Sequence, residues 1–153
     1  MSDVTESTEA DGPRPSETDA AKIAVVRDIL DSWTAQDWER VAALFAPDGV
    51  LQSVMSEPVV GREAFAQRLE VLHQGLERIQ LHIKAIGVID GRVWVERVDD
   101  FDVNGHHGEV PVVGILTVTD GMVSHWLEYY DRATLLRGMG LATSEDFAEP
   151  AGH

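Results

Sequence analysis

The fold is decided by a stretch in which side chains alternate in character, Val93-Trp94-Val95-Glu96-Arg97-Val98-Asp99-Asp100-Phe101. Successive side chains of a β-strand point to opposite faces, so one face would carry Val93, Val95, Arg97, Asp99 and Phe101. Charges on an apolar face are unusual, because an unpaired buried charge costs roughly several kcal/mol. We therefore expect Arg97 to contact a carboxylate inside the protein.

A second strand is predicted at Trp126-Leu127-Glu128-Tyr129-Tyr130-Asp131, where Trp126, Glu128 and Tyr130 share a face. If this face meets that of Arg97, one guanidinium lies between the carboxylates of Asp99 and Glu128. The alternative is a set of cross-strand ion pairs on a solvated face. The apolar and aromatic neighbours on both faces favour a pocket.

Composition excludes several classes of function. The chain has 153 residues, the size of one domain, with 27 acidic and 12 basic residues and a net charge of −15. Such a charge argues against nucleic acid or an anionic membrane as a partner, because both require basic patches. Without cysteine there is no disulfide, thiol nucleophile or Cys-based metal site. No apolar run reaches the ~20 residues of a membrane span and no secretory signal is visible, so we expect a cytoplasmic protein.

The chain divides into a disordered acidic tail at 1–17, a single domain at 18–140 and a mobile tail at 141–153. Thr18 or Asp19 can cap a first helix, and Asp37 can cap a second. Ala46-Pro47-Asp48-Gly49 predicts a turn before a short strand at 50–54. A third helix follows Gly61, with one apolar stripe made of Phe65, Leu69, Leu72 and Leu76.

From Ile79 onward the pattern changes to a period of two residues, which is typical of strands. Asp90-Gly91, Asn104-Gly105 and Asp120-Gly121 are hairpin signals that separate four long strands. A short helix at 133–137 follows. Helices first and a meander of strands afterwards predict an α+β domain. We expect its curved, mainly antiparallel sheet to form a cone over the helices, with an apolar pocket inside.

Arg97 between two carboxylates suits acid–base chemistry on an epoxide. Two carboxylates in one site of low dielectric differ in proton affinity, so one can be protonated while the other is ionised. The acid would protonate the epoxide oxygen, and the base would remove a proton from an attacking water or substrate hydroxyl. Such a reaction requires no cofactor and no metal. His106 and His107 fall in a predicted polar hairpin tip, where we assign no metal ligand.

The sequence resembles the limonene-1,2-epoxide hydrolase family at three places, which are Pro58-Val59-Val60-Gly61-Arg62-Glu63-Ala64, Glu96-Arg97-Val98-Asp99 and Trp126-Leu127-Glu128-Tyr129-Tyr130-Asp131. The resemblance implies a six-stranded mixed sheet over three to four helices, a homodimer and one-step hydrolysis without a cofactor. It implies that Asp99 is the acid and Arg97 the bridging cation. Glu128 falls where the family has the Asp that activates water.

Two positions depart from the resemblance. Where the family holds its water with a Tyr and an Asn, this chain has Leu51 and Ser53. Leu51 cannot hold a water, so a hydroxyl of the substrate could attack instead, which would make the protein an epoxide-opening cyclase. The residues expected to bind a small apolar epoxide or polyketide-like substrate are Leu51, Ser53, Phe101, Trp126 and Tyr130.

Two other functions stay open. The same cone serves ketosteroid isomerases and polyketide cyclases, which move protons at carbon, but Gln52 and Ser53 stand where an Asp base would be expected. The third candidate is a non-catalytic module that binds a small molecule in the cone.

Overall fold

The structure is a computed structural model that describes residues 17–141. The predicted tails lie outside the described residues, apart from Glu17 and Leu141. Glu17 belongs to the folded body, because its Oε2 accepts a hydrogen bond of 3.0 Å from the backbone N–H of Gly121. The helices are α2 (Asp19–Thr34), α3 (Trp38–Ala43), α4 (Arg62–Leu72) and α5 (Arg132–Gly138).

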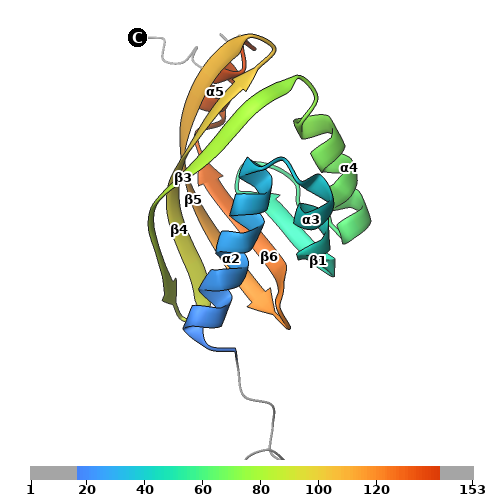
Figure 1. Ribbon diagram of the computed structural model, residues 1–153, viewed down its shortest axis with the longest axis vertical. Helices are drawn as coiled ribbons and strands as arrows, with labels where there is room; N and C mark the ends of the chain where they lie inside the picture. Colours follow the sequence, from blue (N-terminus) through green and yellow to red (C-terminus); the bar gives the residue numbers. More distant parts are fainter. Residues whose placement is uncertain (1–16, 142–153) are drawn as a thin grey trace, which may run out of the picture.

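One curved sheet carries the fold, and its strands are β1 (Phe45–Ser53), β2 (Val59–Val60), β3 (Leu76–Ile89), β4 (Arg92–Val103), β5 (His106–Thr119) and β6 (Met122–Tyr130). The strand order is β2-β1-β6-β5-β4-β3, and only β1 and β6 run parallel among the neighbouring pairs of the described chain. Helices α2, α3 and α4 lie on one side of the sheet (Figure 1). The predicted α+β class and the mixed, mainly antiparallel sheet are confirmed.

The three predicted hairpin turns connect β3 to β6. Asp90, Asn104 and Asp120 have φ values of 52°, 50° and 53°, and the glycine after each one also has a positive φ. Two successive residues with positive φ define the type I′ turn, whose twist matches that of paired strands. The local sequence therefore favours the three tight turns that connect the strands of the meander.

The predicted helix caps are also present. The side chain of Thr18 accepts a hydrogen bond from the backbone N–H of Ala21, and that of Asp37 from the N–H of Arg40. These helices cover the inner face of the sheet with a core of fully buried side chains. Its largest members are Trp126, Phe45, Phe65, Ile29 and Leu30.

The structure corrects three details of the prediction. Ala46-Pro47-Asp48-Gly49 is not a turn, because it lies inside β1. Phe45 is fully buried and pairs with Val123 of β6, so the chain is already in the sheet, and a register shift before Val50 absorbs the extra residues. A turn-rich composition indicates an irregularity here but not its kind.

Leu76 does not belong to the stripe of α4, which ends at Leu72. It starts β3 after a glycine with positive φ. In β3 the register also shifts between Ile83 and Ala85. Because of this shift, the side chains that face the core are at odd-numbered positions up to Ile83 and at even-numbered positions from Ile86 onward. Ile86 and Val88 therefore pack on the core.

Candidate active site

The inner face of the sheet and the helices enclose a cavity of about 180 Å³. β5 lies between β4, which carries Arg97 and Asp99, and β6, which carries Glu128. All the residues predicted for the site line this cavity, and they are Leu51, Ser53, Arg97, Asp99, Phe101, Trp126, Glu128 and Tyr130. The expected pocket therefore exists, and these residues come from three strands, β1, β4 and β6.

Arg97 contacts both carboxylates at once. Its Nε and Nη2 donate to Asp99 Oδ1 and Oδ2 at 2.7 and 3.1 Å. Its Nη1 and Nη2 donate to Glu128 Oε2 and Oε1 at 2.9 and 2.6 Å. The Arg97 side chain is only 3% exposed, Asp99 15% and Glu128 13%. The ion pairs are thus inside the protein, and the alternative of a solvated face does not describe this group.

The two ion pairs set the charges at the site. Burial lowers the pKa of Arg97, but Glu128 and Asp99 together raise it well above its usual range, so the guanidinium stays charged. Burial raises the pKa of Asp99, and Arg97 offsets only part of this effect. Asp99 therefore holds its proton to higher pH than an ordinary aspartate does.

Glu128 is surrounded by hydrogen-bond donors. Besides the two Arg97 bonds, the indole Nε1 of Trp126 donates to Glu128 Oε2 at 2.6 Å. None of these three N–H groups can accept a hydrogen bond, so the arrangement suits a carboxylate that acts only as an acceptor. Asp99 and Glu128 share one cation but differ in their remaining surroundings.

Gly114 of β5 makes room for the pair of Arg97 and Glu128. A Cβ at this position would lie 2.8 Å from Glu128 Oε2 and 3.0 Å from Arg97 Nη1. Gly114 pairs with Glu128 across the β5–β6 ladder, so the carboxylate crosses directly above it. The sequence analysis missed this residue. A single glycine within an alternating strand is the signal that could have identified it.

The two positions that depart from the resemblance also lie in the cavity wall. In the parallel β1–β6 pair, Leu51 lies beside Trp126 and Ser53 beside Glu128. The hydroxyls of Ser53 and Tyr130 are 2.9 Å apart and hydrogen-bonded. A hydroxyl pair thus lies next to Glu128, in place of the two water-holding side chains that the resemblance implies.

Three tryptophans form an aromatic wall. The ring of Trp33 meets those of Trp38 and Trp126 edge to face, with centroids 5.3 and 5.6 Å apart. All three line the cavity, whereas Phe65 is fully buried in the core. The spacing of apolar residues along a helix does not distinguish core side chains from cavity-lining ones. A side chain on the inner face of a helix can pack on the core and border a cavity at once.

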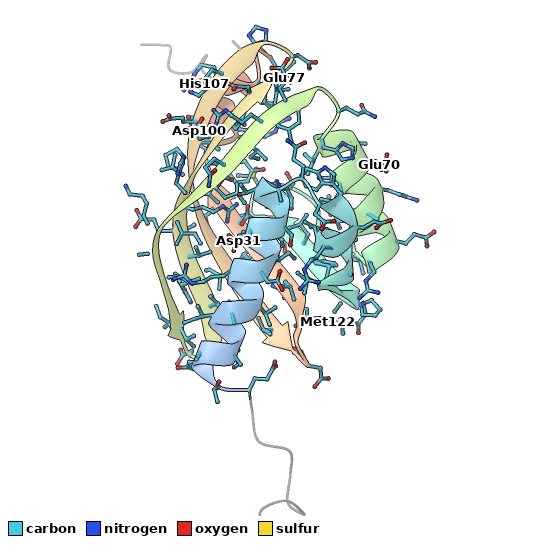
Figure 2. All side chains as sticks on the ribbon, viewed as in Figure 1. Asp31, Glu70, Glu77, Asp100, His107 and Met122 are labelled. Carbon is cyan, nitrogen blue, oxygen red and sulfur yellow. The ribbon has the colours of Figure 1, made fainter. Side chains whose placement is uncertain are left out.

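A second cluster of polar residues lies on the outer face of the sheet. Within residues 17–141, Asp100, His107 and Glu109 are the group that offers ligand atoms all within 4.8 Å of one another. Figure 2 shows Asp100 and His107 on the side of the sheet away from α4. Arg78 already binds Asp100 at 2.7 Å, so a cation occupies part of the cluster. The cluster does not border the cavity.

Comparison with known families places the chain in one of them. The family described as the SnoaL-like domain matches residues 26–126, which is more than half of the chain. This range includes the cavity residues from Trp33 to Trp126 and ends two residues before Glu128. Among residues 17–141 no helix is long and apolar enough to cross a membrane.

Solved structures share the fold at low identity. An LEH-like epoxide hydrolase from M. tuberculosis has a TM-score of 0.70 and 23% identity, covering 79% of this chain and 90% of its own. A candidate SnoaL-like polyketide cyclase from Jannaschia sp. CCS1 has a TM-score of 0.72 and 21% identity, covering 86% and 100%. A protein of ketosteroid isomerase-like fold from Catenulispora acidiphila has a TM-score of 0.68 and 21% identity, covering 76% and 92%. These likenesses show the fold, which several activities share.

Proposed function

We infer a function from the premise that the chain belongs to the SnoaL-like domain family, whose fold is shared by epoxide hydrolases, polyketide cyclases and ketosteroid isomerases. We propose that this protein is a cofactor-free enzyme that opens an epoxide in a mostly apolar substrate. The observation that carries the proposal is one buried guanidinium that binds the carboxylates of Asp99 and Glu128 at once. This arrangement favours the split of acid and base that epoxide opening requires.

In the proposed reaction Asp99 is the general acid. Its raised pKa keeps a proton available, which passes to the epoxide oxygen as the C–O bond breaks. Glu128 is the base and removes a proton from the attacking oxygen while that oxygen bonds to carbon. With water as the nucleophile the product is a diol. Asp99 ends ionised and Glu128 protonated, and transfer of one proton from Glu128 to Asp99 restores the starting state.

The hydrogen bonds favour one oxygen of Glu128 as the basic atom. Each carboxylate oxygen can accept about two hydrogen bonds. Oε2 receives two, from Trp126 Nε1 and Arg97 Nη1, whereas Oε1 receives one, from Arg97 Nη2. Oε1 therefore keeps the free lone pair that can accept a proton. Arg97 holds Oε1 directly, and Trp126 holds the same carboxylate through Oε2.

The nucleophile can be water or a hydroxyl of the substrate. Leu51 offers no hydrogen bond, and one of the two O–H groups of Ser53 and Tyr130 is used in the bond between them, so fewer donors remain to hold a water. This observation favours intramolecular attack as a second route. An epoxy alcohol incubated in ¹⁸O-labelled water separates the two. Label in the product shows hydrolysis, and an unlabelled cyclic ether shows cyclisation.

A panel of neutral substrates tests the proposal. Purified protein without added metal or cofactor is incubated with terpene and alkene epoxides and with steroid enones, and products are identified by mass spectrometry. We expect diols or cyclic ethers from the epoxides and no isomerisation of the enones, because no carboxylate stands at Gln52 or Ser53. Isomerised enones without epoxide turnover would identify a ketosteroid isomerase-like enzyme. Binding of apolar ligands without any turnover would identify a binding module.

We also propose a homodimer and a cytoplasmic location. The resemblance implies the dimer, and the outer face of the sheet supports it. There the aromatic side chain of Tyr129 is 47% exposed. Light scattering on the purified full-length chain measures the mass, and a monomer at micromolar concentration would contradict the dimer.

A further inference from the structure

Arg68 of α4 is the second cation that lines the cavity, and it has no partner among the described residues. No hydrogen bond or ion pair joins its guanidinium to another group of residues 17–141. The positions three and four residues away along the helix are Ala64, Phe65, Val71 and Leu72, which carry no charge. Neighbours at these spacings are the ones that a helical side chain can pair with, so α4 itself cannot neutralise Arg68.

The acids of the cavity wall do not neutralise it either. Asp99 and Glu128 are the acidic residues of the wall, and the guanidinium of Arg97 binds both. Acids are plentiful elsewhere, with 27 acidic residues against 12 basic ones in the chain. Arg40 and Arg78, which lie outside the cavity, both have carboxylate partners. The cavity thus presents one cation whose charge nothing in its surroundings balances.

The two cations stand at different depths. Arg97 is 3% exposed, whereas Arg68 is an exposed residue and so belongs to the rim of the cavity. The wall also contains the apolar side chains of Trp38, Leu72 and Ile79. A ligand that matches this pattern has a reactive polar group at the inner end, an apolar middle and an anionic group that reaches the rim.

We propose that Arg68 is a specificity-determining residue that binds the carboxylate of the substrate, and that the substrate class is an epoxide with a carboxylate at the end of an apolar chain. A carboxylate fits the planar fork of guanidinium donors and can bind it through two hydrogen bonds. The inference rests on the proposed epoxide opening for the identity of the inner group. The anion site itself rests on Arg68 alone.

The test compares a decanoic acid that carries an epoxide at its far end with the methyl ester of the same compound. We expect the wild-type protein to prefer the acid in kcat/KM on the order of tenfold, the value of one charge-assisted hydrogen bond at a partly exposed site. Arg68→Gln should remove this preference through KM of the acid and leave the ester unchanged. Arg68→Glu should reverse it. Arg27→Gln is the control. It removes the same charge, but Arg27 is an exposed residue of α2 that lies outside the cavity wall.

A binding measurement separates this inference from the proposed reaction. Decanoic acid and methyl decanoate, which have no epoxide, are titrated against the full-length protein while tryptophan fluorescence is recorded, because Trp33 and Trp38 line the cavity. Binding of the acid that Arg68→Gln weakens and Arg27→Gln does not would support the anion site, even if no epoxide is opened. Equal binding and equal turnover of acid and ester by the wild type, or equal losses in both variants, would overturn it.

Discussion

Strand β4 presents the same kind of charged group on both of its faces, and the two groups behave differently. The inner group is Arg97 with Asp99 and Glu128, and the outer group is Arg78 with Asp100 and Asp102. Each has one guanidinium between two carboxylates at hydrogen-bond distance. The side chains of the outer group are 45%, 18% and 33% exposed, against 3%, 15% and 13% for the inner one.

Exposure reverses the direction of the pKa shifts. Burial raises the pKa of Asp99 in spite of its arginine. The hydrogen bond from Arg78 lowers the pKa of Asp100, and hydrogen bonds from His107 and then Arg78 lower that of Asp102. At the outer carboxylates the hydrogen bonds outweigh desolvation, whereas at Asp99 desolvation is the largest effect. Of the two groups, the inner one is therefore the one whose aspartate pKa is raised, as the proposed general acid requires.

The largest expected effect is the loss of the acid. Asp99→Asn removes the proton donor but keeps the size of the side chain, so we expect kcat/KM for a neutral epoxide to fall by roughly 10²–10⁴. Asp100→Asn, the matched change on the outer face, should leave kcat/KM unchanged. Steady-state kinetics measures both, with circular dichroism as a check of folding. Equal activities of the two variants would remove Asp99 from the mechanism.

The next comparison concerns stability. Arg97→Met leaves two carboxylates buried without their cation, so we expect the free energy of unfolding to fall by about 3–5 kcal/mol. Arg78→Met leaves carboxylates that water solvates, and its denaturation midpoint should stay at the wild-type value. Urea titration followed by tryptophan fluorescence measures this difference. A similar loss in both variants would show that the inner group is as well hydrated as the outer one.

A smaller effect is expected from filling the space that Gly114 leaves for Arg97 and Glu128. Gly114→Ala places a methyl group 2.8 Å from Glu128 Oε2 and should displace the base, which lowers kcat/KM on the order of tenfold to 10²-fold. Adding Glu128→Asp shortens the side chain by one methylene and should restore part of the loss. A double-mutant cycle of kcat/KM measures the coupling. Purely additive effects would mean that Gly114 does not act through Glu128.

The smallest expected effect is on how the free energy of unfolding depends on pH, because Asp99 and Asp100 should change it in opposite directions. Because the pKa of Asp99 is raised in the folded state, its stabilising contribution is present below the usual aspartate pKa and is lost as pH rises through the raised value. The lowered pKa of Asp100 gives the opposite sign, with stability lost as pH falls. In Asp99→Asn the unfolding free energy should therefore decline less as pH rises above the usual aspartate pKa, and in Asp100→Asn it should decline less as pH falls below that pKa. Unchanged profiles in both variants would contradict the two shifts.

The parts of the fold that local chemistry controls were predictable. The hairpin turns at Asp90, Asn104 and Asp120 and the caps at Thr18 and Asp37 all depend on residues within a few positions of one another. Two predictions were wrong, the turn at 46–49 and the continuation of the third helix to Leu76. The first was wrong because turn-forming residues also occur in bulges. An apolar residue such as Leu76 likewise suits a helix stripe and a strand equally well.

The residues of the candidate site were likewise predictable only in part. Alternation placed Arg97, Asp99 and Phe101 on one face of β4, and Trp126, Glu128 and Tyr130 on one face of β6, and the structure has both. Gly114 and Arg68 were missed because their importance comes from neighbours that are distant in the sequence.

The sequence by itself determined the order of the elements, the three hairpins and the faces on which the charged side chains lie, since these depend on turn chemistry and on a strand period of two residues. Only the tertiary structure decided that β4 and β6 bring their charges together across Gly114 at the inner end of a cavity, while the neighbouring charges of β4 lie on the outer face of the sheet. The physical reason is that the proton affinity of a carboxylate depends on how much solvent surrounds it, and the exclusion of solvent is a property of the whole fold.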